Sequence, residues 1–340
     1  MKLVFLALIP LILSIGITPA LSFDFIPEAD ALKSKGNSLT ETGSKKVCGD
    51  RLCSETETSK QPSMVEEQVD ATDEIIYQNG IYQLVKVSEN IYSFGSSMAN
   101  FSLIMITDEG VIIGDPANQE HSEVMLEAIR TITDQPIKYL IYSHSHWDHT
   151  SGGQVFKDEG AIILSHVDAR DWLLKNPNPN VVVADEIWEG NFKEIVLGGQ
   201  TLELHHYGPS HGEGMTVFYL PDDKIAFIVD IVTPKRLGFT IMPDFSPKGW
   251  IQTLIEVEKL DFDTAMFGHK RAYGPASEVT EIREYLQDLR AEIFKMMQDG
   301  VNPMMIPSTI ELPKYQDWEF YNEWLEMNTW RVLLELHMGW

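Results

Sequence analysis

Residues 144–149, His-Ser-His-Trp-Asp-His, constrain this chain more than any other segment. Residues 139–143 before them are aromatic and β-branched, which is typical of a β-strand. Gly152 and Gly153 follow and allow the backbone to turn. The motif is therefore expected at a strand end, where side chains enter a cleft. Four of its side chains are of metal-binding types: His144, His146, Asp148 and His149.

The spacing within the motif suits two neighbouring metal ions. In an extended chain His144 and His146 point the same way, about 7 Å apart along the backbone. Two imidazoles placed like this can converge on one ion. Asp148 and His149 lie beyond the strand end, where the chain bends, and can face a second point nearby. Two close metals need two such groups of ligands.

Three further residues of ligand type follow strand-like segments. His211 lies in the Gly-rich turn 208–214, after a strand expected over residues 201–207. Asp230 ends the apolar run 224–229, and His269 follows the short strand-like segment 264–268. Sheet edges are where open α/β architectures place their sites. We therefore expect these three side chains to join the motif.

The order strand, HxHxDH, Gly-Gly, then His211, Asp230 and Gly268-His269 resembles the metallo-β-lactamase-fold hydrolases. The segment 103–113, ending in Gly114-Asp115-Pro116, is similar to an early strand of that family, and the resemblance covers about residues 76 to 275. It implies an α/β (α+β) fold, a four-layer αββα sandwich. The sequence alone indicates only an α/β protein with much antiparallel strand.

The resemblance also implies a ligand set. Metal one would be bound by His144, His146 and His211, and metal two by Asp148, His149 and His269, with Asp230 and a hydroxide bridging both. A bridging Asp is similar to the glyoxalase II, lactonase and sulfatase-like branches. Asp148 would in addition act catalytically, by moving a proton to the leaving group. Ser143, Ser145 and Asp115 are candidates for hydrogen bonds that fix the histidine tautomers.

The resemblance thus predicts an enzyme with two divalent metal ions. The expected function is hydrolysis of a small ester, lactone, lactam, thioester or sulfate-type bond. Zinc is the first choice of metal, but mixed nitrogen and oxygen ligands also admit iron or manganese. The alternative is a two-iron redox protein, or a binding protein without turnover, on the same fold.

The formal net charge of −25 bears on partners. Such a surface repels nucleic acid and attracts anionic lipid poorly. We therefore expect a small-molecule substrate, no nucleic acid and no stable membrane partner.

The N-terminal segment predicts export. Lys2 precedes an apolar run, and Ala20-Leu21-Ser22 offers a cleavage point. Residues 1–22 are therefore predicted to be a signal peptide, and the protein is expected to be secreted or extracytoplasmic. An uncleaved membrane anchor is the alternative. Residues 23–74 are polar and without periodicity, as in a disordered linker. Cys48 and Cys53, the only cysteines, are expected to form a disulfide there, with free or intermolecular thiols as the alternative.

Residues 75–275 are expected to form the catalytic domain and residues 276–340 a C-terminal helical extension. A helix is predicted over residues 276–298, capped by Ser277 or Thr280 and stopped by Asp299-Gly300. A second helical segment, 317–339, carries an aromatic stripe. Such a stripe is most typical of packing against the body or a second subunit, which would make a homodimer. A lid over the substrate is the alternative.

The remaining polar residues are given mainly structural roles. His121 opens a predicted helix and is expected at the surface. His205 and His206 are expected to be structural or exposed, with a role beside the metals as the alternative, and His166 matches no ligand position. Lys235 and Arg236 are expected to be solvated rather than to hold a substrate carboxylate, and Trp147 to lie at the rim of the site.

Overall fold

A computed structural model describes residues 73–339, all of which belong to the compact unit Glu66–Trp340. The predicted signal peptide 1–22, the disulfide Cys48–Cys53 and nearly all of the linker 23–74 lie outside the described residues. Within residues 73–339, no helix combines the length and the apolar character that crossing a bilayer requires.

The first sheet holds strands β1 to β8 in chain order. Strands β1 to β5 pair antiparallel, and β5 to β8 pair parallel. Parallel neighbours need crossover connections, and helices α1 to α4 provide them. The strands are Glu74–Asn79, Tyr82–Lys86, Ile91–Gly95, Phe101–Thr107, Gly110–Gly114, Ile137–Ile141, Ile162–His166 and Glu186–Trp188. The helices are Gln119–Ile132, Trp147–Thr150, Gln154–Asp158 and Val167–Lys175.

The second sheet has the order β14-β13-β12-β11-β10-β9. All its pairs are antiparallel except β12 with β13, which α5 (Pro247–Val257) connects. Strands β9 to β14 are Phe192–Leu197, Gln200–His205, Val217–Leu220, Ile225–Ile228, Thr264–Phe267 and Tyr273–Pro275. Two long helices follow, α6 (Ser277–Gln298) and α7 (Tyr321–Met338), separated by 3-10 turns at Pro303–Met305 and Pro313–Tyr315.

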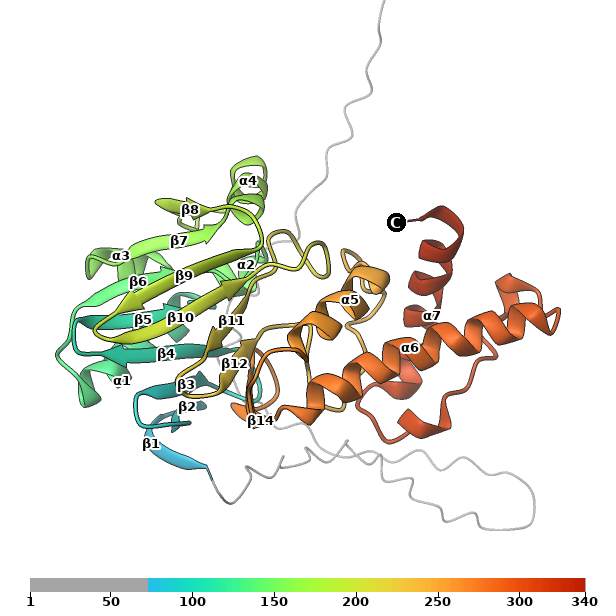
Figure 1. Ribbon diagram of the computed structural model, residues 1–340, viewed down its shortest axis with the longest axis horizontal. Helices are drawn as coiled ribbons and strands as arrows, with labels where there is room; N and C mark the ends of the chain where they lie inside the picture. The colour runs from blue at the N-terminus through green and yellow to red at the C-terminus, as the bar shows by residue number, and fades with distance from the viewer. Residues whose placement is uncertain (1–72, 340) are drawn as a thin grey trace, which may run out of the picture. The chain divides into compact units, whose positions relative to one another are not determined.

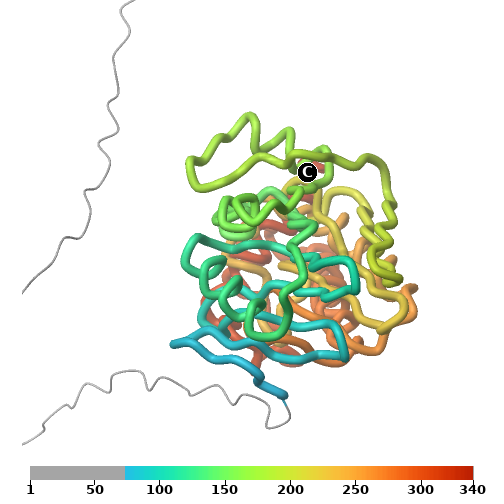
Figure 2. Tube along the Cα trace, turned by 90° about the vertical axis from the view of Figure 1, so that its left-hand side faces the viewer, coloured from blue at the N-terminus to red at the C-terminus, as the bar shows by residue number. Residues whose placement is uncertain are grey.

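The side chains of each strand alternate between two cores, as the pleat requires. In β5, Ile112 faces the core between the sheets, whereas Val111 and Ile113 face α1, α3 and α4. In β12, Phe227 faces the same central core, whereas Ala226 packs toward α5, α6 and α7. Figure 1 shows these three helices together on the right of the strands, and in Figure 2 they lie behind the N-terminal strands. The expected four-layer αββα sandwich is confirmed.

The C-terminal helices differ from expectation in one detail. Helix α6 begins at Ser277 after Ala276, and none of the described side chains caps it. The predicted cap Thr280 instead donates to Glu258 Oε1 at 2.6 Å, which ties α6 to the end of α5. The predicted stop is confirmed, because Asp299 is the C-cap and Gly300 has φ 81°. A side-chain contact to a distant element therefore took the place of the local cap.

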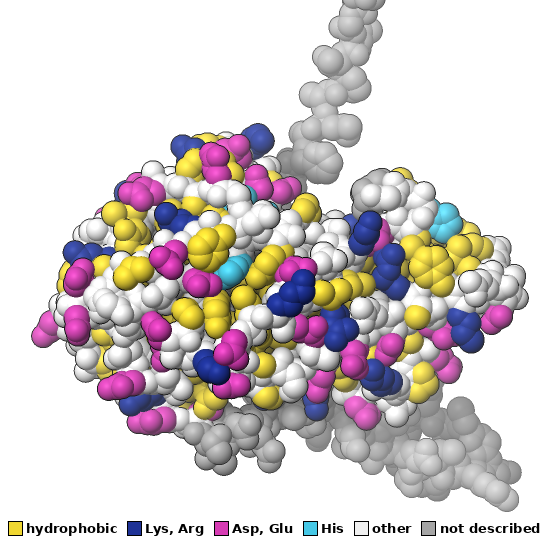
Figure 3. Space-filling view, viewed as in Figure 1, with side chains coloured by type: hydrophobic (Ala, Val, Ile, Leu, Met, Phe, Trp, Pro, Cys, Tyr) yellow, Lys and Arg dark blue, Asp and Glu magenta, His cyan; other side chains and the backbone are white. Residues whose placement is uncertain are grey.

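The aromatic side chains of the C-terminal extension pack largely against the body. Trp324 contacts the ring of Phe239 at a centroid distance of 5.5 Å, and Trp318 and Trp330 pack against the core that includes residues of β11, β12 and β13. Other apolar side chains of this region are exposed, among them Met304, Met305 and Met338. Figure 3 shows apolar side chains gathered near α6 and α7. A homodimer contact there stays a prediction.

Candidate metal centre

The HxHxDH motif lies where β6 gives way to helix α2. After Ile141 the backbone hydrogen-bonds on through Tyr142 to β7, and His144 is fully buried. His146 is the N-cap residue of α2, so Asp148 and His149 stand on the first turn of that helix. The change from strand to helix after His146 turns the second pair of side chains away from the first, as the spacing predicts.

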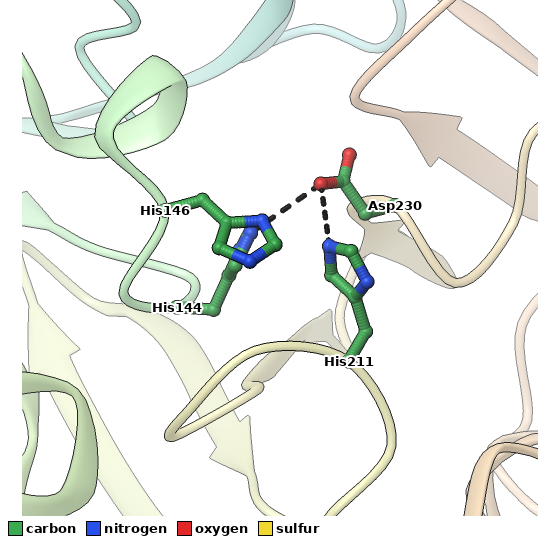
Figure 4. A group of neighbouring side chains, drawn as sticks. All are labelled: His144, His146, His211 and Asp230. Atoms are coloured by element: carbon green, nitrogen blue, oxygen red, sulfur yellow. Dashed lines mark hydrogen bonds and ion pairs between the residues drawn. The ribbon is translucent and has the colours of Figure 1, made fainter. Parts of the chain in front are cut away.

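The structure brings His144, His146, His211 and Asp230 into one group. One ligand atom of each lies within 4.8 Å of the others. His211 comes from the loop between β10 and β11, and Asp230 from the end of β12, with a left-handed backbone (φ 57°). Figure 4 shows the three imidazoles and the carboxylate directed toward one point.

A second group contains Asp148, His149 and His269, whose ligand atoms also lie within 4.8 Å of one another. Nε2 of His149 lies 3.5 Å from Asp148 Oδ2. His269 reaches the group from the loop after β13. All seven residues that the sequence singles out thus meet at one edge of the two sheets.

Asp230 lies between the two groups and turns one oxygen to each. Its Oδ2 lies 3.3 Å from His144 Nε2 and 3.0 Å from His211 Nε2. Its Oδ1 lies 3.3 Å from His149 Nε2 and 2.7 Å from His269 Nε2. Burial alone would raise the pKa of Asp230, but the surrounding histidines, His149 and His269 foremost, hold it well below its usual range. The carboxylate is therefore ionised and shared.

Hydrogen bonds behind the groups fix which nitrogen faces the centre. Ser143 donates its hydroxyl hydrogen to Asp115 Oδ2 (2.6 Å) and so accepts from Nδ1 of His144 (2.8 Å). Nδ1 of His149 donates to the same Asp115 oxygen at 3.1 Å. Both rings therefore present Nε2 to Asp230, as histidine ligands oriented by a carboxylate do. The roles suggested for Ser143 and Asp115 match these bonds, whereas Ser145 accepts a backbone N–H from Glu213 instead.

Two contacting residues were missed by sequence reasoning. Asp244, from the loop between β12 and α5, forms a close ion pair with Nε2 of His146. Because that contact engages Nε2, the other ring nitrogen of His146, Nδ1, is the candidate metal-ligand atom. Asn100 donates to the backbone oxygen of Asp148 at 3.0 Å and lies 3.1 Å from Nε2 of His149. No local sequence pattern around Asp244 or Asn100 predicts a role in the site, because only the tertiary structure brings these residues to it.

The donor set fits divalent cations. Within residues 73–339, Nε2 of His144 and Oδ1 of Asp230 are buried and make no hydrogen bond of good geometry, although both lie in the close ion pairs just described. Burial alone would lower the pKa of His149, but Asp230 and Asp115 raise it well above its usual value. These carboxylates thus favour positive charge at the centre of the cluster. Buried nitrogen and oxygen atoms that face one point are what imidazole and carboxylate metal sites present.

A third group, His166, Asp168 and His206, is less suited to a metal. The rings of His166 and His206 stack nearly in parallel, at 4.2 Å and 20°. An imidazole binds an ion in its own ring plane, so two stacked rings cannot both address one ion. Among His144, His146 and His211 the planes cross at 61° to 86°. We assign His166 and His206 to packing, in line with the sequence expectation.

The expectation that His121 lies at the surface is wrong. Its side chain is fully buried, edge-on to the rings of Tyr82 and Phe94. Its Nε2 lies 2.8 Å from the hydroxyl of Ser102, which itself donates to the backbone oxygen of Asp115. Burial, with a smaller effect of His149, lowers the pKa of His121 to about 3. His121 thus belongs to the buried face of α1 as a neutral imidazole. The sequence pattern did not predict this position because histidine is a polar residue.

A cavity of about 420 Å³ opens beside the two groups. His146, Asp148, His211, Asp230 and His269 line one side of it, and the loop of residues 231–246 lines another.

Arg236 lies in the wall that this loop forms, half-buried, with Nη2 donating to Thr233 Oγ1 at 3.1 Å. Lys235 is exposed, as expected, whereas Arg236 is only partly exposed and lies in the cavity wall. A larger cavity of about 710 Å³ is lined by none of the seven ligand-type residues.

Helix α7 holds the 231–246 loop in place. Asn328, fully buried, donates to the backbone oxygens of Gly238 (2.8 Å) and Thr240 (2.7 Å). Its Oδ1 accepts from the hydroxyl of Tyr285 at 2.8 Å. Arg331, from the next turn, donates to the backbone oxygens of Met242 and Phe245. The C-terminal extension thereby fixes one wall of the cavity.

We expect Asn328→Leu to lower the free energy of unfolding by about 3 kcal/mol, since three buried polar groups lose their partner. Thr329→Val is the matched control, because Thr329 is equally buried but bonds only to Leu325 in its own helix. We expect the control to change stability by less than about 1 kcal/mol. Urea unfolding of both variants measures the difference, and equal stabilities would contradict the role of Asn328.

Gly212 packs directly against the first group. It has φ 57°, and a Cβ there would lie 2.9 Å from Cδ2 of His144 and 3.3 Å from Nε2 of His146. Gly208, in the same loop, has φ 95° and open space around it. Both Gly→Ala variants should lose about 1 kcal/mol of stability from backbone strain. Only Gly212→Ala should also weaken metal binding, by about tenfold, because it displaces ligand rings. Titration against a chromophoric chelator tests this, and equal affinities would contradict it.

Comparison with known proteins agrees with this arrangement. A family model described as the metallo-beta-lactamase superfamily matches residues 96–269, which is more than half of the chain and contains all seven ligand-type residues. A solved structure of a metallo-beta-lactamase from Pontibacter korlensis matches with a TM-score of 0.56 and 23% identity, over 61% of this chain and 99% of that one. This likeness concerns the fold.

Two curated relatives match parts of the chain at somewhat higher identity. The 2,4-dinitroanisole O-demethylase subunit alpha of Nocardioides sp. (strain JS1661) is 30% identical over 135 residues, 40% of this chain and 41% of that protein. The hydroxyacylglutathione hydrolase of Brucella anthropi is 25% identical over 213 residues, 60% of this chain and 77% of that protein. The match thus spans less than half the length of the first relative.

Proposed function

The chain belongs to the metallo-beta-lactamase superfamily, and we propose that it is a dinuclear metal-dependent hydrolase. Relatives of this fold include hydrolases. The substrate of this chain would be a small molecule with an ester, lactone, lactam, thioester or sulfate-type bond. The observation that carries this proposal is the position of Asp230, whose two oxygens face two separate groups of imidazoles. One carboxylate shared in this way is suited to hold two cations side by side.

The proposed ligands follow the two groups. His144, His146 and His211 would hold one divalent ion, and Asp148, His149 and His269 the other, with Asp230 common to both. Zinc is the proposed metal, since four-coordinate sites of imidazole and carboxylate are typical of it. Iron and manganese accept the same ligands, so the metal content of protein grown in defined medium decides between them.

Two such ions would lower the pKa of a bound water toward neutrality and polarise the bond under attack. The protein supplies orientation and charge. Asp115 and Ser143 hold His149 and His144 in fixed tautomers, and Asp244 holds His146. Asp148 is the most exposed carboxylate of the set and lines the cavity, where it can hold a proton and pass it to a departing group.

A chelation experiment with a substrate panel tests this function. The purified protein would be stripped of metal, reloaded with zinc, manganese or iron, and assayed on chromogenic ester, thioester, lactam and sulfate substrates. We expect hydrolysis of at least one class, lost on chelation and restored by two equivalents of metal per chain. Two tightly held iron atoms with no hydrolysis of any class would instead favour the redox alternative.

We propose that the protein is exported. This proposal rests only on the sequence pattern of residues 1–22. Mass determination of the mature chain from the producing cells tests it. A mature protein that begins after about residue 22 agrees with a cleaved signal, whereas the intact chain in the membrane fraction agrees with an anchor.

A further inference from the structure

The 420 Å³ cavity beside the ligand groups has a mainly apolar wall opposite them. This wall combines the 231–246 loop with side chains of α5 and α6, and the cavity lies against Asp230 and His269, where the bond to be cleaved must sit. A 150 Å³ cavity is enough for benzene, so about two rings fit here. The apolar wall residues are Leu237, Phe239, Phe245, Trp250 and Ile282.

The wall is rigid before any ligand arrives. Four backbone oxygens of the loop accept hydrogen bonds from Asn328 and Arg331 of α7. Thr240 and Met242 have left-handed backbones, with φ 44° and 48°, which surrounding contacts must hold in place. Trp250 donates its indole N–H to the backbone oxygen of Ile231 at 2.8 Å, so its ring is fixed as well. A preformed cavity selects its ligand by shape and polarity.

The polar side chains in this wall already have partners. Asp244 pairs with His146, and Arg236 donates to Thr233. A charged group placed among Leu237, Phe239 and Phe245 would lose its hydration without a compensating bond, which is unfavourable. The carboxylate of Asp244 repels an anion, and Arg236, the cation of this wall, is half-buried and already bonded to Thr233. Phe239, which is 54% exposed, extends the apolar wall toward the mouth of the cavity.

We propose that this cavity is a subsite for an uncharged, apolar part of the substrate, an alkyl chain or an aryl group of up to two rings. The inference rests on the proposed hydrolase function and narrows it. The substrate is then a neutral molecule whose apolar part is buried between the loop and α6 while its cleavable bond faces Asp230. A substrate with a second, anionic group in this position is disfavoured.

A matched set of esters tests the subsite on the metal-loaded full-length protein. The 4-nitrophenyl esters of acetate, valerate and glutarate share a leaving group, and the last two differ only by a terminal methyl against a terminal carboxylate. After subtraction of each ester's spontaneous release of 4-nitrophenolate, which for the glutarate ester includes attack of its own carboxylate on the ester carbonyl, we expect kcat/KM for valerate to exceed that for acetate by at least about tenfold. The glutarate ester should be at least about tenfold slower than valerate.

Two phenylalanine variants locate the preference. In Phe239→Ser the ratio of valerate to acetate should fall by about threefold or more, because part of the apolar wall is removed. In Phe294→Ser, on the exposed side of α6 (44% exposed) and outside the cavity lining, the ratio should not change. Equal rates for valerate and glutarate, or equal ratios in wild type and Phe239→Ser, would overturn the subsite and leave the hydrolase function standing.

A binding measurement separates failure of the subsite from failure of the function. Biphenyl-4-carboxamide is neutral, cannot be mistaken for an anionic metal ligand, and fills about two rings. If no substrate class of the panel is hydrolysed but saturation-transfer NMR shows this amide bound to wild type and not to Phe239→Ser, the subsite stands and the hydrolase proposal fails. If neither hydrolysis nor binding is seen, both are overturned.

Discussion

Asp230→Asn is expected to abolish metal-dependent hydrolysis, with kcat lower by about a thousandfold or more, a loss of about 4 kcal/mol in transition-state stabilisation. The carboxylate turns one oxygen to each group of imidazoles. Asparagine keeps the shape but replaces one oxygen with an NH₂ group, which cannot bind a cation, and removes the negative charge. Metal content per chain should fall in parallel, as elemental analysis would show.

The asparagine variant should still fold, which makes the result interpretable. Asp230 has φ 57°, and asparagine is among the residues that adopt this left-handed conformation most readily. Asp171→Asn, an exposed position on α4, controls for loss of a carboxylate elsewhere. Thermal unfolding of both variants should remain cooperative. A fully active Asp230→Asn protein would show that Asp230 does not hold the metals.

Asp115→Asn is expected to weaken metal binding by about 10- to 100-fold without removing a ligand. Asp115 accepts from the Ser143 backbone N–H (2.7 Å), from the Ser143 hydroxyl (2.6 Å) and from His149 Nδ1 (3.1 Å). In the variant an NH₂ group would face a donor, and the orientation of His149 would be lost. Competition with a chelator of known affinity measures the change.

Asp185→Asn is the matched control for Asp115. Asp185 also accepts a backbone N–H, from Ile163 at 3.1 Å, and its side-chain partner is Lys157, not a histidine. Both variants should lose stability, but only Asp115→Asn should lose metal affinity. If the two variants bind metal equally well, Asp115 supports the strand and not the ligands.

The sequence predicted those parts of the site that follow strand ends. His144 to His149, His211, Asp230 and His269 each lie where an apolar, β-branched segment stops. Strands that run in the same direction, as β10, β12 and β13 do, have their carboxyl ends at one edge of the sheet, so residue type and local pattern were sufficient. The layered fold could be predicted only through the family resemblance, because alternation along a strand does not say which sheet it joins.

The remaining site residues depend on contacts between distant segments. Asp244 and Asn328 lie in a loop and a helix whose local sequences carry no signal, and they reach the site through α7 packing on the 231–246 loop. His121 was misplaced because a polar residue at the start of a helix usually faces solvent, whereas Ser102 and two aromatic rings enclose it here. Such long-range hydrogen bonds are set by tertiary packing, which local patterns do not record.

An X-ray structure of the metal-loaded protein, with anomalous scattering collected at the metal edge, tests the central claim most directly. The account predicts two ions per chain. One would contact His144, His146 and His211, the other Asp148, His149 and His269, and Asp230 would touch both. A single ion, or ions bound away from Asp230 in a protein that hydrolyses its substrate, would contradict it.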